Sequence, residues 1–123
     1  MIFRTRKLIK PEDLNAGNTL FGGRVLQWID EEAAIYAMCQ LDTKLIVTKL
    51  ISEVNFVAPA HQGDVIDIGV DVVSFGRTSV TLKVLIRNKD TGLTICQIER
   101  MVFVSVDNKG NPIPHGKKNK KVD

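Results

Sequence analysis

The stretch Asn15-Ala-Gly-Asn-Thr-Leu-Phe-Gly-Gly23 leads directly into an apolar run from Arg24 to Met38, and this junction decides the fold. From Val25 to Met38 apolar residues recur at helical spacing, which predicts a helix, and its first turn is expected to contain Phe21, Gly22 and Gly23. We expect Asn18 or Thr19 to cap this helix. Because it is apolar over most of its circumference, the helix is predicted to be buried.

After the helix the chain changes to runs rich in β-branched residues, separated by short turn sequences. The alternation of apolar and polar residues is clearest from Val80 to Arg87, as expected for an antiparallel strand with one covered face. The expected strands are Phe3 to Ile9, Leu45 to Val57, Asp64 to Phe75, Thr78 to Asn88 and Leu93 to Val106. We therefore predict an α+β domain in which a five-stranded antiparallel sheet is wrapped round one long helix.

The chain has 123 residues, of which 44% are hydrophobic, and this size suits one globular domain. We assign residues 1–114 to that single domain and residues 115–123 to a basic C-terminal tail. Four lysines crowd the tail, and lysines without interleaved aromatic residues are more often a solvated terminus than a nucleic-acid site. We therefore expect no nucleic acid among the partners.

Membrane insertion and metal binding are not expected from the sequence. No apolar run approaches the roughly 18 residues that a membrane span needs, and no signal-peptide pattern is present, so the predicted location is cytoplasmic. Cys39 and Cys96 have neither metal-ligand spacing nor a histidine pattern nearby. We expect both to be free thiols, with no zinc site and no disulfide.

One carboxylate interrupts the apolar face of the predicted helix. At helical spacing Asp30 falls between Gly23 and Ala37. A buried carboxylate costs several kcal/mol unless it is satisfied, so Asp30 is either a functional group or a structural carboxylate in the core or at a subunit contact. The functional interpretation gains support from Gly22 and Gly23, whose backbone N–H groups at the helix start favour an oxygen that is gaining negative charge.

Two loops offer further polar groups. Asn15 has the donor and the acceptor needed to position a water or a carbonyl, or it is simply a turn residue. The hairpin Phe75-Gly-Arg-Thr-Ser79 brings a guanidinium and two hydroxyls together, which suits phosphate binding or an ordinary solvated hairpin. His61 and His115 lie in loop-like sequence away from any Ser or Cys nucleophile, so a nucleophile–histidine pair is poorly supported.

Together these residues resemble the hotdog-fold acyl-CoA thioesterases, specifically the small bacterial single-domain acyl-CoA hydrolases. The resemblance covers residues 3–114 and rests on Asn15-x3-Thr-Leu-Phe-Gly-Gly23 with Asp30 seven residues later, supported by Val47 to Pro59, Gly63-Asp64 and Gly76-Arg-Thr-Ser79. It implies a hotdog fold, dimers as the minimal active unit, and often a trimer of dimers, that is, a homohexamer. It also implies an active site at the dimer interface and a place in fatty acid metabolism.

The resemblance further implies catalytic roles for particular residues. Asp30 matches the family's catalytic carboxylate, and Asn15 matches the asparagine that faces it from the partner subunit. Thr48 lies in the strand segment that neighbours this site. Relatives commonly have glycine where this chain has Asn18, so either the loop is shaped differently or Asn18 shares the role assigned to Asn15.

The hairpin residues match those that contact coenzyme A in relatives, namely Arg77, Thr78 and Ser79. The resulting hypothesis is hydrolysis of an acyl-CoA thioester, with coenzyme A as part of the substrate and no cofactor or metal. Whether Asp30 acts as general base or as nucleophile is left open by the sequence. The alternatives are a non-catalytic acyl-CoA-binding or regulatory hotdog domain and, more weakly, a hotdog dehydratase, which the lack of a histidine near the helix start opposes.

Overall fold

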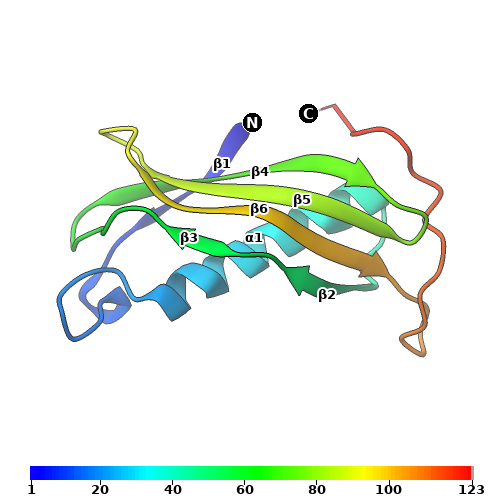
Figure 1. The fold of residues 1–123 in the computed structure, drawn as a ribbon, viewed down its shortest axis with the longest axis horizontal. Coiled ribbons are helices and arrows are strands. Elements are labelled where there is room, and N and C mark those ends of the chain that lie inside the picture. Colours follow the sequence, from blue (N-terminus) through cyan, green and yellow to red (C-terminus); the bar gives the residue numbers. More distant parts are fainter. Residues whose placement is uncertain (123) are drawn as a thin grey trace.

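The computed structural model describes residues 1–122, so Asp123, the last residue of the expected tail, lies outside the described residues. One long helix, α1 (Gly22–Leu41), lies along one face of an antiparallel sheet (Figure 1). The strands are β1 (Ile2–Leu8), β2 (Ile46–Ile51), β3 (Val54–Phe56), β4 (Val65–Phe75), β5 (Ser79–Asn88) and β6 (Thr94–Ser105), and a 3-10 turn, η1 (Pro11–Asp13), precedes the helix. The strand order is β1-β4-β5-β6-β2, with β3 also paired to β6. The predicted α+β arrangement is confirmed.

The expected strand from Leu45 to Val57 is two strands in the structure. Both β2 and β3 pair antiparallel with β6, and the break between them falls at Ser52. There the backbone N–H of Ser52 donates to the carbonyl of Arg100 at 2.9 Å, and the hydroxyl of Ser52 accepts from the N–H of Arg100 at 3.1 Å. The sheet of residues 1–122 therefore has six strands, and the prediction of five was wrong.

The core lies between α1 and the sheet. The alternation predicted for β5 is confirmed, because Val80, Leu82, Val84 and Ile86 are each at most 2% exposed. Residues one turn apart on the helix make up its buried face: Val25, Ile29, Ala33 and Ala37. The helix is not covered all round, since Ile35 is 55% exposed in the single chain.

A buried carboxylate ties the three strands at one side of the sheet together. Asp67 of β4 is 3% exposed, and it lies opposite Arg6 of β1 and Arg87 of β5 in the strand register. The guanidinium of Arg6 binds Asp67 at 2.9 Å, and that of Arg87 lies 3.7 Å from its other oxygen. These cross-strand pairs neutralise a charge that is costly to bury alone.

The helix begins without the expected side-chain cap. The N-cap is Phe21, rather than Asn18 or Thr19, and no side-chain hydrogen bond caps the helix there. Tertiary hydrogen bonds fix this part of the chain instead: the N–H of Leu20 donates to Ala60 at 2.8 Å, and the N–H of Phe21 donates to Asp13 at 2.9 Å. The capping prediction is wrong because these backbone bonds, which the local sequence does not reveal, set where the helix starts.

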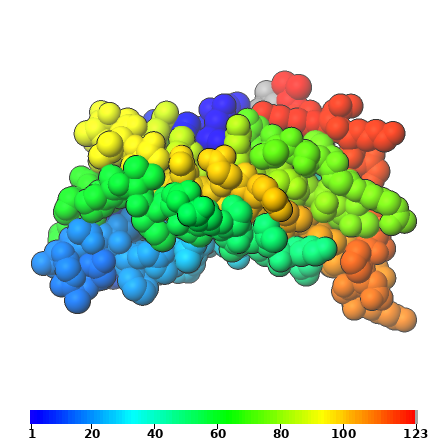
Figure 2. All heavy atoms as spheres, in the orientation of Figure 1, coloured from blue at the N-terminus to red at the C-terminus, as the bar shows by residue number. Residues whose placement is uncertain are grey.

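The tail, described for residues 115–122, runs along the end of the molecule that holds the β4–β5 hairpin (Figures 1 and 2, red). Three of its four lysines pair with carboxylates of the domain: Lys117 and Lys121 with Asp42, and Lys120 with Asp71. The tail is exposed over most of its length, and these surface ion pairs attach it to the domain.

Two further expectations concern the whole of residues 1–122. Within this range no helix is long and apolar enough to cross a membrane, and no three metal-binding side chains are grouped together. Cys39 is exposed and Cys96 is buried, and both are free thiols, as predicted.

Candidate active site

Asp30 and Thr48 are brought together across the interface of α1 and β2. The hydroxyl of Thr48 donates to Oδ1 of Asp30 at 3.0 Å. Asp30 is half-buried in the single chain, so the expectation of a fully buried carboxylate is not met there. One carboxylate oxygen is thus held by Thr48, while the other has no hydrogen-bond partner among the described residues and is available to a water or a substrate.

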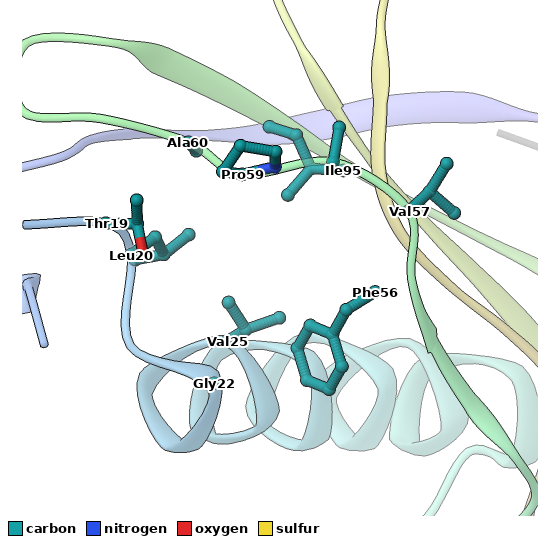
Figure 3. A pocket seen from close by; sticks show the side chains of 10 residues that line it. Thr19, Leu20, Gly22, Val25, Phe56, Val57, Pro59, Ala60 and Ile95 are labelled. Carbon is teal, nitrogen blue, oxygen red and sulfur yellow. The ribbon is translucent and has the colours of Figure 1, made fainter. Parts of the chain in front are cut away.

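The start of α1 borders an apolar pocket of about 360 Å³. Figure 3 shows Val25 and Phe56 on one side of this space and Pro59 with Ile95 on the other, with Gly22 at the helix start. Its remaining lining residues are Thr19, Leu20, Val57, Ala58 and Ala60. An apolar cleft that ends on a helix N-terminus suits a ligand with an apolar chain and an electron-rich oxygen.

Gly22 places an unengaged backbone donor at this pocket, and Gly23 has a second one next to it in the chain. As the first two residues of α1 they have no intrahelical acceptor for their N–H groups, and no other acceptor is found among the described residues. A Cβ on Gly23 would lie 2.7 Å from the ring of Phe21, so a side chain there would displace this aromatic ring. The two donors also lie at the positive end of the helix dipole.

Asn15 organises the loop before the helix. Its side-chain oxygen accepts from the N–H groups of Gly17 and Thr19 at 2.9 and 3.1 Å, and its amide donates to the hydroxyl of Thr19 at 3.0 Å. The interpretation as a turn residue therefore holds within one chain, and it leaves any role toward a second chain open. Asn18 has φ = 63°, a left-handed conformation that favours glycine and that asparagine tolerates best among other residues.

The two proposed catalytic elements of one chain do not meet. Eight residues of continuous helix separate Gly22 from Asp30, which corresponds to about 12 Å along the axis. A carbonyl held by the helix start and a water held by Asp30 must come within about 3 Å of one another to react. Within one chain, two groups of candidate residues thus lie apart: Gly22, Gly23 and Asn15, named the Gly22 half-site below, and Asp30 with Thr48, named the Asp30 half-site.

The β4–β5 hairpin lies nearer to the Asp30 half-site. Thr48 of β2 and Val80 of β5 both pair with Phe103 of β6, so they lie at one level of the sheet, two strand spacings or about 10 Å apart. The hairpin begins just beyond Val80. A Cβ at Gly76 would clash with the hydroxyl of Ser79, so a side chain there would force that hydroxyl to move.

The hairpin residues are held by the end of the chain. The carbonyl of Thr78 accepts from the N–H of Ser105 at 2.8 Å, and the carbonyl of Arg77 accepts from the N–H of His115 at 3.3 Å. The side chain of Arg77 is exposed and forms no ion pair with any described residue. The structure thus places Arg77 and Thr78 in the turn of this hairpin and Ser79 at the start of β5.

Several residues of this region do not stand out in the sequence. Phe56 and Val57 line the apolar pocket, although both are more than half exposed, and Lys118 lies beside Arg77 in a second pocket. The signal for Phe56 was an aromatic side chain at the end of a strand run, immediately before Pro59. For Lys118 no local signal existed, because its place depends on where the tail packs.

Comparison with known proteins establishes the family. The family model described as the thioesterase superfamily matches residues 17–95. The chain belongs to the thioesterase superfamily. By this membership it is a thioester hydrolase, and the enzyme class expected from the resemblance is confirmed.

Similar proteins support the same assignment. An uncharacterized acyl-CoA thioester hydrolase of Haemophilus influenzae is 31% identical over 85% of this chain and 71% of its own length. An acyl-CoA hydrolase of Staphylococcus aureus, solved with butyryl coenzyme A and coenzyme A, is 31% identical with a TM-score of 0.81, covering 89% of this chain and 66% of that one. A hexameric hotdog fold thioesterase of Campylobacter jejuni is 28% identical with a TM-score of 0.77, covering 89% of this chain and 86% of that one. This thioesterase therefore has the predicted hotdog fold.

Proposed function

We propose that this thioesterase hydrolyses acyl-CoA thioesters to a free carboxylic acid and coenzyme A, at a site built from two chains. The observation that carries the proposal is the separation of about 12 Å between Gly22 and Asp30 along one continuous helix. A twofold dimer pairs the Gly22 half-site of one chain with the Asp30 half-site of its partner, and twofold symmetry produces two such sites. The names of the relatives support acyl-CoA as the substrate.

Exposed apolar residues support a dimer that involves β2. This strand is last in the sheet, and within residues 1–122 no strand pairs with its outer edge. Val47, Leu50 and Ile51 of β2 are 47%, 39% and 41% exposed. An apolar strand edge is a ready-made surface for pairing with another chain. By the resemblance, three such dimers form the complete assembly, and the hexameric relative agrees with this.

We further propose the following chemistry. The thioester oxygen accepts hydrogen bonds from the N–H groups of Gly22 or Gly23, a contribution of about 3 to 4 kcal/mol per donor in comparable sites. Asp30 of the partner takes a proton from a water, whose oxygen attacks the carbonyl carbon. The tetrahedral oxyanion then collapses, the carbon–sulfur bond breaks, and coenzyme A leaves as the thiolate and takes up a proton.

Each neighbouring group has a role in this scheme. Thr48 holds one oxygen of Asp30 and leaves the other to the water. Asn15, with Asn18 beside it in the loop, faces Asp30 of the second chain and orients the water or the carbonyl. The acyl chain enters the apolar pocket at the helix start, and coenzyme A reaches Arg77, Thr78 and Ser79 of the hairpin. No step requires a metal or a cofactor. We assign residues 1–114 to the catalytic domain and residues 115–123 to a basic C-terminal tail.

The test is turnover of acyl-CoA, followed as release of free thiol. We expect Asp30→Asn, which keeps an oxygen for the Thr48 hydroxyl, to lower kcat by about 10² to 10⁴, the usual contribution of a general base. Glu31→Gln is the matched control, because it neutralises the adjacent, exposed carboxylate. Full turnover by Asp30→Asn would contradict the assignment. If the unmodified protein binds acyl-CoA and releases no thiol above background, it is the non-catalytic acyl-CoA-binding domain instead.

The two chemical roles open to Asp30 are separable by a second measurement. If Asp30 attacks the thioester directly, an acyl group is transiently attached to its carboxylate, and rapid quenching followed by mass spectrometry detects the added mass on the peptide that contains Asp30. We expect no such adduct. Its appearance during turnover would replace the general-base scheme by a nucleophilic one and leave the site assignment in place.

A further inference from the structure

A second pocket lies where the tail crosses the β4–β5 hairpin. It has a volume of about 400 Å³, within the usual range for small-molecule sites, and it is lined by Phe75, Gly76, Arg77, Pro114, Gly116, Lys117 and Lys118. Three of these residues carry positive charge, and no acidic residue lines the pocket. Three of the lining residues belong to the hairpin and three to the tail, and Pro114 directly precedes the tail.

The ion pairs of the tail leave two of these cations unneutralised. Lys117 is 2.7 Å from Asp42, which also binds Lys121, and Lys120 is 2.6 Å from Asp71. Lys118 is the one tail lysine that pairs with no carboxylate among residues 1–122, and Arg77 has none either. These two positive charges without a carboxylate partner, those of Lys118 and Arg77, therefore both line this pocket.

Hydrogen bonds on both sides of Lys118 fix the path of the tail. Nε2 of His115 donates to the carbonyl of Ser79 at 2.8 Å, and Nδ1 of His115 accepts from the N–H of Lys117 at 2.9 Å. Farther along, the N–H of Lys121 donates to Oε1 of Gln40, a side chain that is 1% exposed. The backbone around Lys118 is thus attached to the hairpin before it and to the end of α1 after it.

The carboxylate of Asp42 is well suited to anchor the tail. Hydrogen bonds from Lys117 and Lys121 lower the pKa of Asp42 from 3.8 to about 2. Asp42 therefore stays ionised throughout the range in which an enzyme of this kind is assayed. It also ends α1 in a left-handed conformation, with φ = 54°, which asparagine adopts as readily as aspartate.

We propose that this pocket is a phosphate-binding site in which the tail contributes Lys118 beside Arg77 of the hairpin, and that it takes the phosphates at the nucleotide end of coenzyme A. Arg77 offers a fork of donors to phosphate oxygens, and Lys118 adds a second positive charge. The inference rests on the proposed function for the identity of the ligand. It adds to that function a specificity-determining residue that lies outside residues 1–114.

Direct binding tests the site without any turnover. Isothermal titration with adenosine 3′,5′-bisphosphate, at low salt, is compared for the unmodified protein, Lys118→Ala and the control Lys89→Ala. Lys89 follows the far end of β5, about 30 Å along the strand from the hairpin. We expect Lys118→Ala to weaken binding about fivefold, the effect of one partly exposed charge contact, and Lys89→Ala to leave it unchanged. Equal affinities for these two variants would overturn the proposal.

A third variant separates the placement of Lys118 from net charge. Asp42→Asn keeps the backbone conformation at the helix end but removes the acceptor of Lys117 and Lys121. It makes the protein more positive, so simple attraction would tighten binding of the bisphosphate. If the tail must be anchored to hold Lys118, binding weakens instead, and we expect this weakening to reach at least twofold. Tighter binding by Asp42→Asn would overturn the role given to the tail.

Turnover provides a second readout. The ratio of kcat/KM for an acyl-CoA to kcat/KM for the matching acyl-N-acetylcysteamine thioester, which lacks phosphates, should fall about fivefold in Lys118→Ala and stay constant in Lys89→Ala. An unchanged ratio in Lys118→Ala would contradict the site. If the bisphosphate binds through Lys118 but neither thioester is hydrolysed, the phosphate site stands and the proposed hydrolase activity fails.

Discussion

Two inactive variants of this protein should restore activity when they share a dimer. In Asp30→Asn only the carboxylate half-site is damaged, and in Asn15→Ala only the half-site at the helix start. In the proposed site each reacting centre draws one half-site from each chain, because about 12 Å of helix separates Gly22 from Asp30. A mixed dimer therefore contains one site with both changes and one site with neither.

The size of the recovery follows from this arrangement. When equal amounts of the two variants are unfolded, mixed and refolded, random pairing places half of the chains in mixed dimers, and one of the two sites in each is intact. About one quarter of the unmodified activity should return, for a twofold dimer or for a trimer of such dimers. The assay is thiol release from acyl-CoA, with each variant refolded alone as the baseline and size-exclusion chromatography to confirm assembly.

One result would refute the two-chain site. If both half-sites acted within a single chain, no pairing of the two variants would rebuild an intact centre. The refolded mixture would then show no more than the mean of the two residual activities. Such a result, obtained with properly assembled mixed dimers, would mean that Asn15 and Asp30 do not act on one substrate from different chains.

Other predictions follow from single contacts. Thr48→Val removes the hydroxyl that donates to Asp30 and should lower kcat about tenfold with a smaller effect on KM, as measured by steady-state kinetics; an unchanged kcat would remove Thr48 from the site. Leu82→Ala empties a fully buried position and should lower the free energy of unfolding by about 2 to 5 kcal/mol in urea titrations, so a loss below about 1 kcal/mol would contradict the packing described. Burial raises the pKa of Cys96 from 9.0 to about 11, so the folded thiol keeps a proton that the unfolded thiol loses, and stability should fall between about pH 9 and pH 11. The decline should be shallower in Cys96→Ala, and identical slopes would show that the thiol does not contribute.

Much of the fold was predictable because it depends on local periodicity. The alternation from Val80 to Ile86 reports which face of β5 is covered, and the helical spacing after Gly23 reports the buried stripe of α1. The division between β2 and β3 was not predictable in this way, since neither glycine nor proline marks it. It depends on hydrogen bonds between Ser52 and Arg100, which are 48 residues apart in the chain.

The candidate residues stand out in the sequence, but their contacts with one another do not. Asp30 stands out in sequence as a carboxylate on an apolar face, and the glycines identify the helix start. The hydrogen bond from Thr48 depends on how β2 packs against α1, which no local pattern encodes. The ion pair between Lys117 of the tail and Asp42 could not be predicted either, because the sequence does not show which distant charged residues will lie side by side.

The cluster of Asp67 with Arg6 and Arg87 has a consequence for how the protein avoids misassembly. β1 is an outer strand of the sheet, and such strands are prone to slide or to pair with a strand of another molecule. A slip of one residue would turn Arg6 to the opposite face and leave the buried carboxylate with one cation instead of two, a change that costs several kcal/mol. The cluster thus makes incorrect alignments of β1 energetically unfavourable, and it protects one border of the sheet against aggregation while the β2 border stays open for a partner.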